Sequence, residues 1–93
     1  MSLSVVGVFD ASLPWCLSEQ VSLRDETFGA LAYHHGNRRL VFLKSRELVE
    51  LVRGLDDFKN VEDAVASSVA PALHDQYLKA LSSLASSEII RER

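Results

Sequence analysis

With 93 residues, of which 47% are hydrophobic and 25% charged, the chain is long enough for one modest core and too apolar for a disordered tail. Its single cysteine, Cys16, excludes an internal disulfide and any metal or iron–sulfur site made from cysteines of this chain alone. The net charge is only −3, no basic leader precedes the apolar start, and no stretch approaches a transmembrane length, so we expect a cytoplasmic protein that binds no membrane.

Residues 1–18 are expected to form an irregular N-terminal arm, and residues 19–93 the folded domain. A tryptophan buries a large area and seldom stays on a surface. The apolar side chains expected to pin the arm to the body are Phe9, Leu13, Trp15 and Leu17.

Three strands are predicted after the arm. Apolar and polar residues alternate from residue 21 to residue 24, and Asp25-Glu26 is expected to make a turn before a second strand over residues 28–35. Gly36-Asn37 is typical of a two-residue type II′ hairpin, since glycine supplies the positive φ that this turn needs at its first central position. The third strand is then expected over residues 38–44.

A two-residue loop fixes the pairing of the last two strands. The expected pairs are Tyr33 with Leu40 and Leu31 with Phe42 on one face, and Ala32 with Val41 and Ala30 with Leu43 on the other. Both faces are therefore apolar, and each needs a cover. We expect helices on one face, and the arm or a partner on the other.

Three helices are predicted after the strands. Ser45 is the expected N-cap of the first helix and Asn60 that of the second, while Pro71 suits the first turn of the third. The apolar stripe expected on the third helix comprises Leu73, Tyr77, Leu78, Leu81, Leu84 and Ala85. Ile89 and Ile90 are expected to close the core. A three-stranded antiparallel sheet followed by three helices predicts an α+β domain of the winged helix-turn-helix-like kind.

The residue pattern gives little support to catalysis or metal binding. His34 and His35 are neighbours in a strand and point to opposite faces, and no carboxylate or thiol completes a tetrahedral set with them and His74. No nucleophile elbow, phosphate-binding glycine loop or zinc-protease motif occurs. The absence of these motifs weakens an enzyme interpretation without excluding it, and we expect no metal site.

Basic residues concentrate in residues 34–46, which contain four bases and no acid. Winged helices often bind DNA through their last helix and wing, so a DNA-binding regulator is one alternative function. The third helix, however, carries Asp75, Lys79 and Glu88 and no arginine, which offers few phosphate contacts. We therefore expect no nucleic-acid partner. A structural subunit that only stabilises an enzyme is the second alternative.

The segment Arg39–Lys44 is an apolar strand expected at the edge of the sheet. An open edge of this kind is either covered, here by residues 1–18, or intended for an added strand. The second interpretation predicts an extended peptide paired with this strand and lying against the third helix, with the N–H of Val41 as one outward donor.

Residues 15–91 carry a resemblance to a known family. It is most specific in the block FGALAYHHGNRRLVFLKS, residues 28–45, and extends to residues 15–17, 21–24 and 80–85. The chain resembles the chaperones of mycofactocin biosynthesis (MftB), which are similar to the PqqD-like chaperones and to the recognition elements of ribosomally made, modified peptides. Cys16 departs from the family, where a basic residue is expected.

The resemblance implies a non-catalytic peptide chaperone. Such a chaperone binds the leader of a ribosomally made precursor peptide and presents that peptide to a radical S-adenosylmethionine (radical SAM) maturase, which holds the cofactors. Carried over by position, the expected peptide-binding residues are Arg39, Leu40, Val41, Phe42, Leu43, Lys44, His74, Tyr77, Leu78 and Leu81. Phe42, Tyr77 and Leu81 would supply the apolar contacts, while Arg39 and Lys44 would steer an acidic leader.

Overall fold

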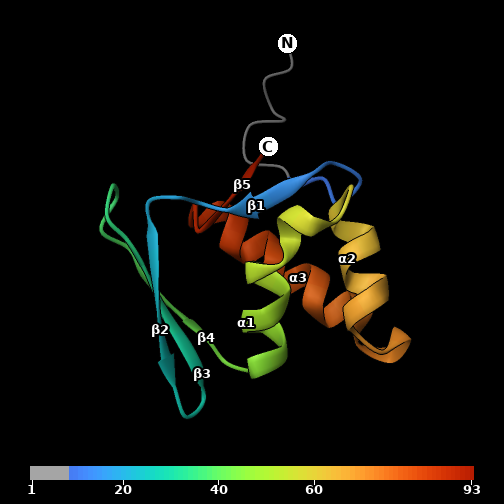
Figure 1. Ribbon diagram of the computed structural model, residues 1–93, viewed down its shortest axis with the longest axis horizontal. Coiled ribbons are helices and arrows are strands. Elements are labelled where there is room, and N and C mark those ends of the chain that lie inside the picture. The colour runs from blue at the N-terminus through green and yellow to red at the C-terminus, as the bar shows by residue number, and fades with distance from the viewer. Residues whose placement is uncertain (1–8) are drawn as a thin grey trace.

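The computed structural model describes residues 9–93 and has an α+β fold, in which a three-stranded antiparallel sheet is followed by three helices (Figure 1). A separate two-stranded ribbon joins the first and last strands. In chain order the elements are β1 Trp15–Leu17, β2 Val21–Glu26, β3 Gly29–His34, β4 Leu40–Leu43, α1 Arg46–Arg53, η2 Leu55–Asp57, α2 Val61–Ser68, η3 Pro71–Leu73, α3 His74–Ser86 and β5 Ile90–Glu92.

The three-stranded sheet has the order β2-β3-β4, so β4 lies at an edge. The four predicted pairs between β3 and β4, from Ala30 with Leu43 to Tyr33 with Leu40, are confirmed. Ala30, Ala32 and Leu43 are buried against the helices, whereas Tyr33 and Phe42 point to the opposite face and are exposed. The predicted turn centred on Gly36-Asn37 therefore gave the correct register, and the helices cover the face that carries Ala30, Ala32 and Leu43.

The hairpin between β3 and β4 differs from the predicted type II′ turn. Arg38, not Gly36, has a positive φ, of 63°. The N–H of Arg38 donates to the carbonyl of His34 (2.8 Å), and the N–H of His34 donates to the carbonyl of Arg39 (2.9 Å). Residues 35–38 thus form a four-residue loop. The side chains of His34 and Asn37 stabilise it by accepting hydrogen bonds from the backbone N–H groups of Gly36 and Arg39.

The turn before β3 also lies later than predicted. β2 continues through Asp25 and Glu26, and the chain reverses at residues 27–28. Gly29 explains the position: its φ is +148°, and a Cβ at this site would lie 2.1 Å from the carbonyl oxygen of Leu43. Only glycine permits so close an approach of β3 to β4 in this conformation.

The predicted helix caps are confirmed. The side chain of Ser45 accepts a hydrogen bond from the N–H of Leu48 (3.1 Å), and that of Asn60 accepts from Asp63 (2.7 Å). Pro71 begins a 3₁₀ turn that leads into α3 rather than the first turn of α3 itself. The largest fully buried side chains form the core, and they include Ile89 as predicted: Leu43, Leu55, Leu81, Ile89, Ile90, Val52, Val61 and Val65.

The expectation of an irregular arm is wrong for residues 15–17, which form β1 and pair antiparallel with β5. Trp15 is buried, its indole N–H donates to the carbonyl of Asp10 (2.9 Å), and its ring lies 5.0 Å from that of Phe9. The pairing satisfies backbone groups of this segment, and Leu17 lies opposite the buried Ile90. Residues 1–8 of the predicted arm lie outside the described residues.

Candidate functional site

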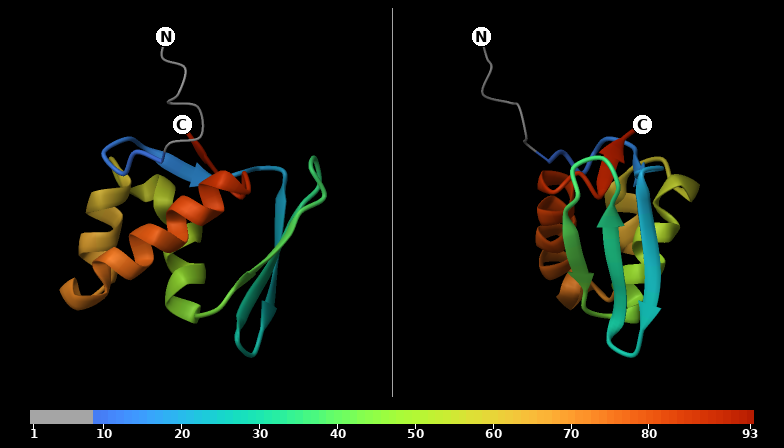
Figure 2. Two further views of the ribbon diagram at one scale, coloured as in Figure 1. Left: turned by 180° about the vertical axis from the view of Figure 1, so that it is seen from behind. Right: turned by 90° about the vertical axis from the view of Figure 1, so that its left-hand side faces the viewer.

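A groove of about 290 Å³ lies between β4 and α3. In the right-hand view of Figure 2, β4 is the edge strand nearer α3, and β2 is the opposite edge. The groove is lined by Val41, Phe42, Lys44, Ser45, Leu48, Gln76, Tyr77, Ala80, Ser83 and Leu84. One wall is a strand edge and the other a helix face, which is the geometry that an extended peptide requires.

The free edge of β4 carries unpaired backbone groups. Hydrogen-bonded pairs alternate with non-bonded pairs along an antiparallel ladder. Since His34 donates to Arg39, the pair of Ala32 with Val41 is hydrogen-bonded too, and the N–H and carbonyl of Leu40 and Phe42 point outward. The prediction that the Val41 N–H points outward is therefore wrong, and the outward groups belong to its neighbours Leu40 and Phe42. Within residues 9–93 no strand pairs with this edge.

The structure brings only some of the predicted site residues to the groove. Val41, Phe42, Lys44 and Tyr77 line it. Leu81, in contrast, is fully buried in the core. Leu81 therefore cannot offer the apolar contact expected of it, because its side of α3 faces the core; Ala80 and Leu84 occupy the groove wall instead.

The other predicted residues lie around the groove rather than in it. Leu43 is buried on the inner face of the sheet, and Leu78 packs against the core. Arg39 and Leu40 are exposed at the hairpin end of β4. His74 begins α3, and its Nε2 lies 2.9 Å from the carbonyl oxygen of Val69, so it serves the turn before the helix.

Sequence reasoning missed several lining residues. Gln76, Ala80, Ser83 and Leu84 share one side of α3 with Tyr77, at spacings that repeat every three to four residues. That spacing relative to Tyr77 was the available signal. Ser45 contributes from the start of α1: its hydroxyl lies 3.2 Å from the Tyr77 hydroxyl, within hydrogen-bond distance.

A second hollow, of about 430 Å³, begins on the other side of Tyr77. It is lined by Glu47, Ser68, Val69, Ala70, Leu73 and Tyr77. Tyr77 contributes to both concavities, so it stands between them.

Hydrogen bonds order the hairpin loop, and one of them reaches the end of α3. Nδ1 of the buried His34 accepts from the backbone N–H of Gly36 (3.0 Å) and Asn37 (3.1 Å). The Asn37 amide oxygen accepts from the N–H of Arg39 (2.9 Å), and its nitrogen donates to the carbonyl of Ser87 (3.3 Å), just after α3. Asn37 thus connects the β4 hairpin to the end of the helix.

Basic residues lie at both ends of β4, and one of them, Lys44, lines the groove. Three ion pairs occur among residues 9–93, and none involves Arg38, Arg39, Lys44 or Arg46. The acids with shifted pKa values lie elsewhere: a hydrogen bond from Arg91 lowers the pKa of Glu19, and one from Ser12 lowers that of Asp10. The unpaired bases flank both ends of β4, where they favour an acidic ligand.

No group of three histidine, cysteine, aspartate or glutamate residues arranged to hold a metal occurs in the described part of the chain. Among the same residues, no helix is long and apolar enough to cross a membrane.

Comparison with known proteins gives one consistent family. A family model described as "Peptide chaperone MftB family" matches residues 14–91. Three similar proteins named "Peptide chaperone MftB" come from Mycobacterium ulcerans (46% identity over 90% of this chain and 78% of the relative), Mycolicibacterium smegmatis (43%, over 88% and 81%) and Mycobacterium tuberculosis (42%, over 91% and 79%). No solved structure matches.

Proposed function

The chain belongs to the peptide chaperone MftB family, and from this premise we propose that it binds the leader of a ribosomally made precursor peptide by strand addition and presents it to a radical SAM maturase. In this role the chain performs no catalysis and holds no cofactor. The leader adds a strand to the outer edge of β4 and lies in the groove against α3.

One observation carries the proposal: the outward N–H and carbonyl groups of Leu40 and Phe42 border a concave, partly apolar groove. A flat, apolar strand edge left open to solvent would be an aggregation hazard. Beside a groove, the same edge provides hydrogen bonds to any backbone, while the groove selects among side chains.

Backbone and side-chain contacts contribute differently to the free energy of leader binding. Each main-chain hydrogen bond contributes about 0.5–1.5 kcal/mol whatever the peptide sequence. Full burial of one apolar leader side chain against Phe42, Tyr77 and Leu84 contributes about 1.5–3 kcal/mol and depends on its shape. Arg39 and Lys44 are exposed, so they act mainly on the association rate of an acidic leader at low salt.

The test is a titration of the purified chain with a fluorescently labelled synthetic leader of its precursor peptide. Ala80→Trp places a large ring in the groove, and we expect it to weaken binding at least about tenfold through steric exclusion. Ala66→Trp, at an exposed alanine of α2 outside both hollows, is the matched control and should bind normally.

A wild-type chain that does not bind the leader would contradict the proposal, as would equal binding by the Ala80→Trp variant. Titration with a pool of DNA duplexes at low salt tests the regulator alternative. A salt-sensitive, sequence-selective complex of submicromolar affinity would favour that alternative.

A further inference from the structure

The face of the sheet that points away from the helices is apolar and exposed. Five large hydrophobic side chains are exposed among the described residues, and four of them lie on this face: Phe28 (43%), Tyr33 (36%), Leu40 (56%) and Phe42 (55%). We call these four residues the outer patch. In Figure 1 and the left-hand view of Figure 2, all three helices lie on the other side of the sheet. The half-buried Leu31 lies within the patch.

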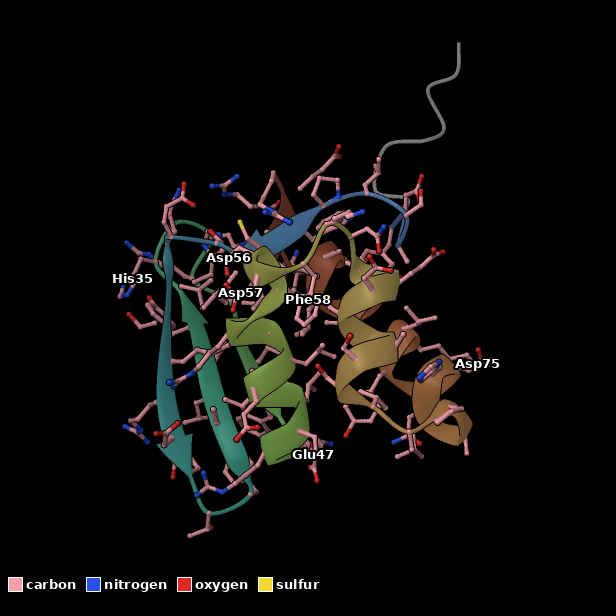
Figure 3. The ribbon with its side chains drawn as sticks, turned by 45° about the vertical axis from the view of Figure 1, so that its right-hand side comes forward. His35, Glu47, Asp56, Asp57, Phe58 and Asp75 are labelled. Atoms are coloured by element: carbon pink, nitrogen blue, oxygen red, sulfur yellow. The ribbon has the colours of Figure 1, made fainter. Side chains whose placement is uncertain are left out.

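The side chains of the outer patch already contact one another. The rings of Phe28 and Phe42 are 5.8 Å apart and tilted, and those of Tyr33 and His35 meet edge to face at 4.9 Å. His35 is in turn held by the hydroxyl of Ser22, at 2.7 Å from its Nε2, and lies on the side of the sheet away from the helices (Figure 3). Aromatic side chains fixed in this way lose little further conformational freedom on binding a partner.

The charges around the outer patch give the chemistry of that partner. The acids of β2 are neutralised, since Glu26 pairs with Arg24 (2.7 Å) and Asp25 with Arg53 (3.2 Å). Arg38 at the hairpin end and Lys44 just after β4 are exposed, and neither has an ion-pair partner among the described residues, so the unpaired charges at the two ends of β4 are positive. The rim is therefore positive, and it fits a surface that carries carboxylates around an apolar centre.

We propose that the outer patch is the docking surface for the maturase, which meets it with an apolar surface bordered by acids. This inference rests on the proposed function, and it assigns the enzyme to a different face of the sheet from the leader groove. Phe42 belongs to both surfaces, because it lines the groove and stacks on Phe28. The leader and the enzyme would then meet along β4, so the chaperone holds the peptide beside its catalyst without covering it.

The test compares two sets of variants for binding to the purified, cluster-loaded maturase. Phe28→Ser combined with Tyr33→Thr removes two rings that do not line the groove, and we expect at least a tenfold loss of maturase affinity. Leu73→Ser, at the fifth exposed hydrophobic residue, lies on the helical side and is the matched control. Arg38→Glu should slow association at low salt, and the effect should shrink as salt is added.

The readouts separate this inference from the proposed function. Leader affinity of the double variant should stay within about twofold of wild type, and its thermal midpoint should show that it is folded. Normal maturase binding by the double variant would overturn the inference while leaving leader binding intact. Failure of the wild-type chain to bind the leader would instead overturn the proposed function. Loss of a dimer in sedimentation, with maturase binding unchanged, would assign the patch to a second copy and also overturn the inference.

Discussion

Replacing Phe42 by proline tests the strand-addition mechanism at the level of one hydrogen bond. The outward N–H of Phe42 is not used by the three-stranded sheet, so its removal affects a bound leader more than the fold. An edge strand tolerates proline where the missing N–H faces outward, and the residue before it, Val41, is already extended. Phe42→Ala removes the same ring and keeps the N–H, and is therefore the reference.

The difference between these two variants isolates the backbone donor. Relative to Phe42→Ala, we expect Phe42→Pro to lose about 0.5–1.5 kcal/mol of leader binding, or about twofold to tenfold in Kd. Val41→Pro should behave in the opposite way. Its N–H pairs with the carbonyl of Ala32, and an unpaired carbonyl costs about 1–3 kcal/mol of folding stability.

Calorimetric titration with the leader and urea unfolding of each variant provide the two measurements. Equal leader affinity for Phe42→Pro and Phe42→Ala would refute the reasoning, because the outer edge of β4 would then donate nothing. A Val41→Pro variant that is stable but does not bind the leader would show that the N–H of Val41, and not that of Phe42, points outward.

Three further predictions concern the support of the site. Leu81→Ala should destabilise the fold by about 2–5 kcal/mol in urea unfolding, because its side chain is fully buried in the core. Asn37→Ala should lower the thermal midpoint and weaken leader binding, since it frees the β4 hairpin from the carbonyl of Ser87; unchanged values for both would show that this link is dispensable. The hydrogen bond from Arg91 lowers the pKa of Glu19, so this pair stabilises the fold at neutral pH. That stabilisation is lost as the pH falls through the lowered pKa. Glu19→Gln should therefore remove this part of the acid sensitivity when unfolding is measured as a function of pH.

The register of β3 and β4 was predicted correctly because the observed four-residue loop and the predicted two-residue loop have the same centre, Gly36-Asn37. A shift of one residue would bury Tyr33 and Phe42 and expose Ala30 and Leu43. Turn positions were predicted less well. Gly36 suggested a two-residue loop, but side-chain hydrogen bonds from Asn37 and its neighbours stabilise a longer one, and sequence spacing does not encode such bonds.

The β1–β5 ribbon was missed because its two strands are short and far apart in the sequence. Trp15–Leu17 pairs with Ile90–Glu92, and neither segment has enough residues to display a period of two. Apolar content correctly predicted that Trp15 and Ile89 are buried, but it carries no information about which backbone pairs with which.

The groove was located from the sequence, but its lining was only partly predicted. The edge strand and Tyr77 were found because an apolar strand and an apolar helix stripe must face each other. Leu81 was assigned to the groove in error, since the stripe of α3 is wide enough to serve both the core and the groove. The spacing from Tyr77 indicates Ala80, Leu81 and Leu84 alike, and it does not show which of them line the groove and which is buried in the core.

The β1–β5 ribbon also gives the single cysteine a use as a reporter of local opening. Cys16 lies in β1 opposite Arg91 and is half-buried. The paired residues are separated by most of the chain, so bringing them together in an unfolded chain costs a large loop-closure entropy. We therefore expect the ribbon to form only after the intervening residues have folded. Opening of this ribbon exposes the half-buried thiol further, so we expect thiol labelling of the native chain to report ribbon opening separately from global unfolding.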